Sequence, residues 1–345
     1  MNTLLILIFG FIFGLLISYA DLNKFNTIMG LSILKNFTVA KTIFLVIGIG
    51  APLLAFEMGS GDAFFHVKPL FLIGTALGGI IFGIGMSILG YCPGTLPISV
   101  GQGSVDALIG ILGGLTGSWI FTLLYPDIVK LSGEDLGSGT LFTWMGSSFT
   151  TVYYLVAILI GILFIVGAFY LNILDRRLNH LKSHRWVVTG VGLAMLNIFL
   201  FYKVVMNKPL GASSSYPYVA DILTGTTQNA YFPTTVSSGS WQVKFLLGAF
   251  LAGLVWAIMT RTFKITLMHA RWLEFKGNNP FKRIVWAFVG GFLLLFGARM
   301  ADGCTSGHII SGGMQFAASS YVFMVFVFIG FLTTGYFFYT TRKKI

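Results

Sequence analysis

The sequence carries very little charge. Only 10% of its 345 residues are Asp, Glu, Lys or Arg, against about 25% in ordinary soluble domains. Apolar residues make up 56% of the chain. So little charge excludes a soluble multidomain protein. The composition predicts one polytopic, all-α integral membrane domain.

Acidic residues are scarcer than basic ones. The chain has 11 Asp and Glu against 22 Lys and Arg, and its net charge is +11. The basic residues gather in short segments between apolar runs, which the positive-inside rule explains without nucleic-acid binding. Asp175–Arg185, Arg261–Arg283 and the tail Arg342–Lys344 are basic, whereas Asp127–Thr150 has three acids and one lysine. We therefore expect the basic segments and the C-terminus in the cytoplasm, and the acidic segment and the N-terminus outside.

Long apolar runs recur along the whole chain. A bilayer-spanning helix needs about 20 mostly apolar residues. The first run lacks the basic start of a secretory signal, so we expect it to be retained as a helix. The predicted spans are Thr3–Ala20, Thr38–Glu57, Leu70–Leu89, Val105–Tyr125, Thr151–Ile173, Trp186–Val205, Val243–Thr260, Ile284–Met300 and Tyr321–Thr340.

Motifs for common chemistries are missing. The sequence has no phosphate-binding loop, no nucleophile elbow and no paired metal motif, so we expect no cofactor, no bound metal and no ATPase activity. Cysteine is limited to Cys92 and Cys304, which gives neither a zinc pattern nor a disulfide framework.

These two cysteines occupy matching places in an internal repeat. A shift of 212 positions places Cys92 on Cys304, and it also places glycines or serines on one another at five further positions. The matched pairs are Gly78 with Gly290, Gly79 with Gly291, Gly85 with Gly297, Ser99 with Ser311, and Gly101 with Gly313.

The repeat predicts an inverted topology, because the third span would end inside and the eighth outside. Gly90–Gly103 and Gly303–Gly313 are too polar to face lipid, so we expect re-entrant loops with short half-helices near the midplane. Lys24–Leu34 and Ser213–Thr224 are expected to be further short helices, and Lys208–Gln242 an outer loop. The expected units are residues 1–125, a linking part 126–185, and residues 186–345.

The thiols of Cys92 and Cys304 are the leading candidates for chemistry. A free cysteine is often only a small buried hydrophobe, but the repeat and the glycine-rich flanks favour a functional role. A polarisable thiol suits a soft sulfur-bearing anion, and the half-helix N-termini would favour negative charge. Around them we expect substrate contacts, or simply loop hydrogen bonds, from Tyr91, Gly94, Thr95, Gly303, Thr305 and Ser306, with Gln102 as a further donor.

Ionisable residues near Cys304 are a second set of candidates, because charge at membrane depth usually marks function. Arg299 could attract anions, reach towards headgroups, or pair with Asp302, three residues later. His308 could bind the anion, carry a proton, or hold the loop. His66 and Lys68 are expected only to tune the surface potential.

Two motifs resemble the YeeE/YedE sulfur transport family. They are Gly-Tyr-Cys-Pro-Gly-Thr at Gly90–Thr95 and Gly-Ala-Arg-Met-Ala-Asp-Gly-Cys-Thr-Ser-Gly-His at Gly297–His308; Asn36–Lys41 and Gly101–Ala107 are similar to it as well. The resemblance implies thiosulfate uptake across a bacterial inner membrane, with cysteines at the constriction of an hourglass. It also implies a small cytoplasmic sulfur-carrier partner similar to the TusA group.

This chain departs from the family pattern at three places. It has no further cysteine near Leu22–Asn26, Asp302 stands where glycine is usual, and Gln102 stands where glutamate is common. Sulfite, polysulfide or a selenium analogue therefore stay open as substrates. A membrane thiol redox enzyme is the alternative of another class, disfavoured because there is no CxxC pair.

The charge pattern makes the orientation testable. Labels placed in Arg176–His184 and after Lys344 should react only from the cytoplasmic side, and labels in Gly133–Gly139 only from outside. Impermeant thiol reagents on introduced cysteines in intact cells and inverted vesicles would measure this. Labelling of Gly133–Gly139 from the cytoplasm alone would overturn the inverted topology.

Overall fold

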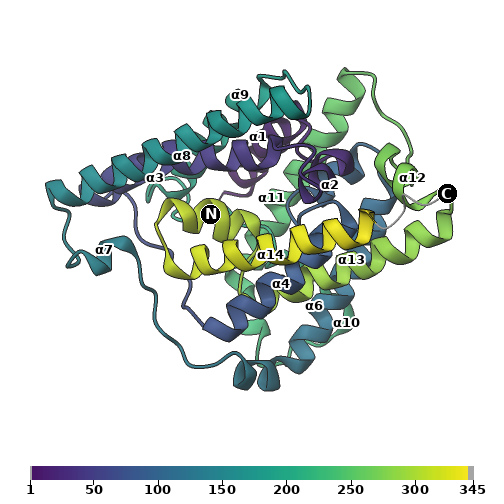
Figure 1. Ribbon diagram of the computed structural model, residues 1–345. Coiled ribbons are helices and arrows are strands. Elements are labelled where there is room, and N and C mark those ends of the chain that lie inside the picture. The colour runs from purple at the N-terminus through teal and green to yellow at the C-terminus, as the bar shows by residue number, and fades with distance from the viewer. Residues whose placement is uncertain (1, 341–345) are drawn as a thin grey trace.

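The computed structural model describes residues 2–340, which form helices and no β-strand (Figure 1). The tail Arg342–Lys344, expected in the cytoplasm, lies outside these residues. The helices are α1 (Thr3–Tyr19), α2 (Phe25–Ser32), α3 (Thr38–Ser60), α4 (Leu72–Leu89), α5 (Leu96–Gly101), α6 (Val105–Leu131), α7 (Leu141–Trp144), α8 (Thr151–Leu178), α9 (Arg185–Phe201), α10 (Ser215–Thr224), α11 (Phe232–Met259), α12 (Ala270–Lys276), α13 (Pro280–Met300), the π-helix η1 (Thr305–Gly312) and α14 (Ala318–Thr340).

Each expected span coincides with an apolar helix. Among the described residues, seven helices are long and apolar enough to cross a membrane, namely α3, α4, α6, α8, α11, α13 and α14. The other two, α1 and α9, are apolar helices of 17 residues each. This confirms an α-helical membrane protein, while the count of nine spans and the division into three units stay predictions.

Short helices lie where the sequence predicted them. Helices α2 and α10 fall within Lys24–Leu34 and Ser213–Thr224, and α5 and η1 follow the two cysteines. The expectation of an outer loop over Lys208–Gln242 is wrong at its C-terminal part, because α11 begins at Phe232. Pro233 lies in the first turn of α11, where its missing N–H costs no hydrogen bond.

Isolated β-bridges between the ends of helices and the connecting segments define two faces of the molecule. Phe71 pairs with Asp135 and Thr140 with Ala317, so the starts of α4 and α14 share a face with the acidic segment. Ser104 pairs with Thr266, so the start of α6 lies at the opposite face with the segment after α11. We call these the acidic-loop face and the basic-loop face.

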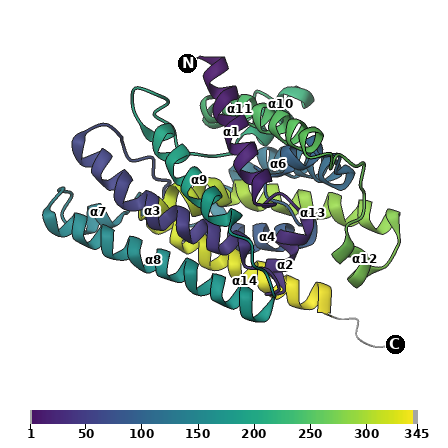
Figure 2. The same ribbon diagram turned by 90° about the horizontal axis from the view of Figure 1, so that it is seen from above.

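Helices α4 and α13 cross at the centre through four glycines. A Cβ on Gly78 would lie 2.8 Å from the carbonyl oxygen of Gly297, and one on Gly297 would lie 2.6 Å from that of Gly78. A Cβ on Gly85 would lie 2.7 Å from the carbonyl oxygen of Gly290. Small residues allow this close backbone approach in membranes, where packing rather than water exclusion drives helix association. Figure 2 shows this pair flanked by α6 and α14.

Adding a methyl group at this crossing should therefore destabilise the protein. In Gly85→Ala the Cβ would lie 2.3 Å from the backbone nitrogen of Leu294, and overpacking of this kind costs about 1–3 kcal/mol or more. We expect a lower thermal unfolding midpoint in detergent. Gly307→Ala is the matched control, because its Cβ would meet nothing within 4 Å; equal midpoints for the two variants would refute the crossing.

Candidate functional site

The turn that carries Cys92 is built by three residues that interrupt the helix. Gly90 ends α4 with a left-handed backbone (φ 79°), a conformation that glycine adopts without strain. Pro93 follows Cys92, and Pro97 lies in the first turn of α5. Thr95 closes the turn, because its hydroxyl accepts from the Cys92 N–H (3.0 Å) and donates to the Cys92 carbonyl (3.1 Å).

The turn that carries Cys304 begins where α13 ends. Asp302 has a left-handed backbone (φ 54°), and the Gly303 N–H donates to the carbonyl of Ala298. Cys304 is buried, and its Sγ lies 3.2 Å from the Ser306 hydroxyl. Both cysteines are free thiols.

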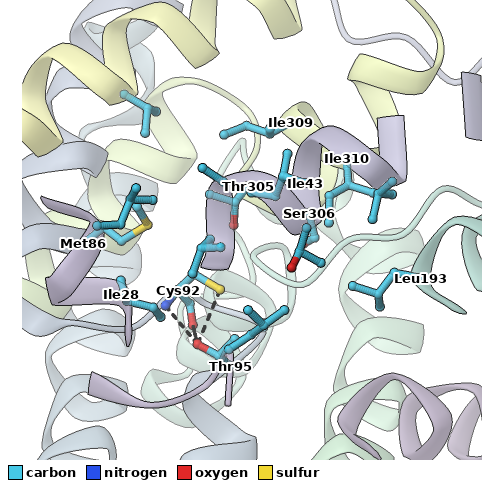
Figure 3. A pocket seen from close by; sticks show the side chains of 18 of the residues that line it. Ile28, Ile43, Met86, Cys92, Thr95, Leu193, Thr305, Ser306, Ile309 and Ile310 are labelled. Atoms are coloured by element: carbon cyan, nitrogen blue, oxygen red, sulfur yellow. Dashed lines mark hydrogen bonds between the residues drawn. The ribbon is translucent and has the colours of Figure 1, made fainter. Parts of the chain in front are cut away.

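Two hollows meet at these turns. On the acidic-loop face lies a polar hollow of about 400 Å³, the vestibule, whose floor includes Gly303, Cys304 and Gly307. On the other side lies an apolar cavity of about 80 Å³, lined by Cys92, Gly94, Thr95, Thr305 and Ser306 together with aliphatic and aromatic side chains (Figure 3). The Cys304 turn is therefore a wall between the two, since neighbouring residues line opposite sides of it.

Arg299 is a buried charge in the wall of the vestibule, which Lys68, Lys208 and Asp302 also line. Only 2% of the residue is exposed, and its guanidinium donates to neutral hydroxyls: Tyr231 at 3.2 Å, Ser214 at 3.3 Å and Ser213. Its Nε has no hydrogen-bond partner. Among residues 2–340 no carboxylate lies within ion-pair distance of Arg299. Asp302 attracts it from further away, so the direct partners of this buried cation are neutral hydroxyls, a costly arrangement.

Of the alternatives for Arg299, the reach towards headgroups does not fit a residue that is only 2% exposed, and Asp302 interacts with Arg299 only at longer range. The close ion pair of Asp302 is with Lys68, at 2.8 Å, which ties the segment between α3 and α4 to the rim of the vestibule. Lys68 therefore does more than tune the surface potential. His66 also lines the vestibule; burial lowers its pKa from the usual 6.5, so it is neutral at pH 7.

The expected contact residues divide into two groups. Gly94, Thr95, Thr305 and Ser306 line the cavity, and Gly303 lines the vestibule. Tyr91 and His308 line neither hollow, which corrects the expectation for Tyr91 as a donor beside the cysteines. Its hydroxyl lies 2.8 Å from His269 and donates to Asp106.

His308 and Gln102 are engaged in holding the fold. The ring nitrogens of His308 lie 2.8 Å from the Ala301 carbonyl and 3.1 Å from the Ser320 hydroxyl. Gln102 binds Asn23, Lys24 and Ser18 through its amide. Of the alternatives for His308, the loop-holding role fits this geometry.

Two buried charge clusters were not recognised from the sequence. Lys41 and Asp175 form an ion pair at 2.8 Å with side chains 1% and 0% exposed, which ties α3 to α8. Arg283 and Asp106 form another at 2.5 Å, both fully buried. The available signal was an ionisable residue close to the end of an apolar run, which is costly in a membrane unless it is paired.

Comparison with known proteins identifies the family of this chain. The family model described as "Sulphur transport" matches residues 25–333. The chain is also similar to a protein named thiosulfate transporter TsuA from Spirochaeta thermophila, at 24% identity over 337 residues, covering 94% of this chain and 95% of that protein. With most of its length matched by the family model, this chain belongs to the sulphur transport family.

Proposed function

We propose that this protein takes up thiosulfate, or a closely related inorganic sulfur anion, from the vestibule across the wall between Cys304 and Cys92. Its family transports sulfur compounds, and its relative is named as a thiosulfate transporter. The observation that carries the proposal is Arg299, a buried cation without a carboxylate partner beside a free thiol. An anion in the vestibule would give this guanidinium a directly bound negative partner.

The two thiols fit the sulfur atom of such an anion. Sulfur is a polarisable, weak hydrogen-bonding partner, and weak contacts let an ion leave as readily as it enters. Beyond the wall, Thr95, Thr305 and Ser306 are neutral polar groups in an otherwise apolar cavity. The anion would meet Arg299 and Cys304 first and Cys92 second.

The inverted repeat is part of this proposal. It is supported by the crossing of α4 and α13, where Gly78 meets Gly297 and Gly85 meets Gly290. In the repeat Gly78 corresponds to Gly290 and Gly85 to Gly297, so a two-fold rotation would map one contact onto the other. Likewise α6 packs on α13 as α14 packs on α4. Helix α8 would be the added span between the halves.

Orientation and partner complete the proposal. The basic-loop face would be cytoplasmic by the positive-inside rule, so the vestibule would open to the outside of a bacterial inner membrane. A TusA-like sulfur carrier would receive the sulfur compound at the basic-loop face. Sulfite and polysulfide are the competing substrates, and a thiol enzyme is disfavoured because both the family and the relative are transporters.

Removing either thiol should strongly reduce uptake. We expect Cys92→Ala and Cys304→Ala each to lower the initial rate of radiolabelled thiosulfate uptake into proteoliposomes, with normal amounts of folded protein. Serine at either position should restore little uptake, because its oxygen is less polarisable than the cysteine sulfur and interacts more weakly with the sulfur of the anion. Unchanged sulfite uptake alongside lost thiosulfate uptake would identify the substrate. If the double alanine variant takes up thiosulfate at the rate of the unaltered protein, both cysteines have only a packing role.

Removing the buried charge should weaken anion binding. A hydrogen bond to a charged group contributes about 1.5–3 kcal/mol, so Arg299→Gln should raise the apparent KM for thiosulfate roughly 10- to 100-fold. Because Arg299 is buried, added salt should change this defect little. Arg185→Gln is the matched control, since Arg185 is 56% exposed on the other face. Normal KM with reduced folded yield would make Arg299 structural.

A further inference from the structure

A cluster of buried polar side chains lies below the Cys92 turn, towards the basic-loop face. It brings together Asp106 at the start of α6, Arg283 near the start of α13, His269 just before α12, and Tyr91. Asp106, Arg283 and Tyr91 are fully buried, and the His269 side chain is 16% exposed. None of the four lines the vestibule or the cavity, so transport as proposed above does not account for them.

Arg283 fixes the end of α4. Its guanidinium donates to the carbonyls of Ile88 (3.2 Å) and Leu89 (2.8 Å), which belong to the last turn of the helix and lack partners within it. It also donates to Asp106 through Nε (3.1 Å) and Nη2 (2.5 Å). The place where the chain leaves α4 is thus tied to α6 and α13 by charge-assisted hydrogen bonds, which are the strong kind.

Both neighbours of Cys92 are held as well. On one side the Tyr91 hydroxyl donates to Asp106 (3.2 Å) and lies 2.8 Å from Nε2 of His269. On the other side the Tyr216 hydroxyl of α10 donates to the Pro93 carbonyl at 2.9 Å. The backbone of Cys92 therefore lies between two residues that are held by hydrogen bonds. Its own Sγ contacts the Thr95 hydroxyl at 3.4 Å and interacts with the side chain of Thr305 across the cavity.

The same cluster holds the short helix that closes the cavity. The ring of Phe25 in α2 lies 4.5 Å from the Arg283 guanidinium carbon and stacks on His269 at 5.2 Å. One turn further along α2, Ile28 and Leu31 line the cavity. The backbone N–H of Arg271 donates to Asn26 at 3.1 Å. Helix α2, which lines the cavity, and the Cys92 turn therefore both contact the segment that contains His269 and Arg271.

We infer that Tyr91, Asp106 and Arg283 are positioning residues that aim the Cys92 thiol into the cavity, and that His269 ties this unit to the segment 262–279 at the basic-loop face. The inference rests on the proposed role of Cys92 in transport. It assigns Tyr91 an action through its neighbour, not on the anion. Movement of the segment 262–279 would be transmitted to Cys92 and to α2 together.

The test removes one hydroxyl. In Tyr91→Phe the turn loses its bonds to Asp106 and His269, each worth a modest net amount, so the alkylation rate of Cys92 by a small uncharged maleimide should rise about 2- to 10-fold. The Cys304 alkylation rate and thiosulfate affinity, measured calorimetrically in detergent, should stay at the unaltered values. In proteoliposomes the maximal uptake rate should fall by a similar factor with KM unchanged. His269→Ala should act in the same direction.

Tyr153→Phe is the matched control, because Tyr153 is another buried tyrosine, packed among Phe142, Phe149 and Tyr154 at the start of α8, and it lines neither hollow. It should change neither alkylation rate. A raised KM or lowered thiosulfate affinity in Tyr91→Phe, with Cys92 alkylation unchanged, would overturn the inference and make Tyr91 a substrate ligand. Absence of thiosulfate binding by the unaltered protein would instead refute the proposed function, whatever the alkylation rates show.

Discussion

The site depends on one constraint: a chain that leaves the helical conformation inside a bilayer must find its hydrogen-bond partners within the protein. Both cysteines lie in such breaks, after α4 and after α13. In the first break, backbone groups form hydrogen bonds with Thr95, Arg283 and Tyr216. In the second, they form hydrogen bonds with carbonyls of the turn and with the ring of His308. These breaks exist because surrounding helices enclose them, and the glycine crossing of α4 and α13 brings those helices close enough.

The buried charged residues differ in whether they have an oppositely charged partner. Lys41 with Asp175 and Arg283 with Asp106 are buried and paired, so they serve the fold. Arg299 is buried with only hydroxyl partners, in a hollow open to the acidic-loop face. Under the proposed function, this contrast between paired and unpaired cations separates structural from functional charge more clearly than burial does. On the proposed pathway, an anion would then be held in the vestibule before it reaches the apolar cavity, which no charged residue lines.

Much of the fold follows from composition and spacing. Apolar runs predicted the nine apolar helices of the described residues. Polar glycine-rich stretches predicted α5 and η1, and amphipathic segments predicted α2 and α10, within a few residues. The sequence could not show where side chains point across helices. Tyr91 precedes Cys92 but turns to Asp106, and Asp302 follows Arg299 but pairs with Lys68. Such partners come from segments 15 to 234 residues away along the chain, and no local pattern encodes them. The start of α11 at Phe232 was missed because its first turns are polar.

The account's central claim is that an anion occupies the vestibule between Arg299 and Cys304. Selenosulfate, the selenium analogue of thiosulfate, makes this directly visible, because selenium gives an anomalous X-ray signal in crystals of the protein. The account predicts one anomalous peak inside the vestibule, in contact with the Arg299 guanidinium and near the Cys304 sulfur, and its loss in crystals of Arg299→Gln. A peak that persists unchanged in that variant, or selenium found only on the basic-loop face, would contradict it.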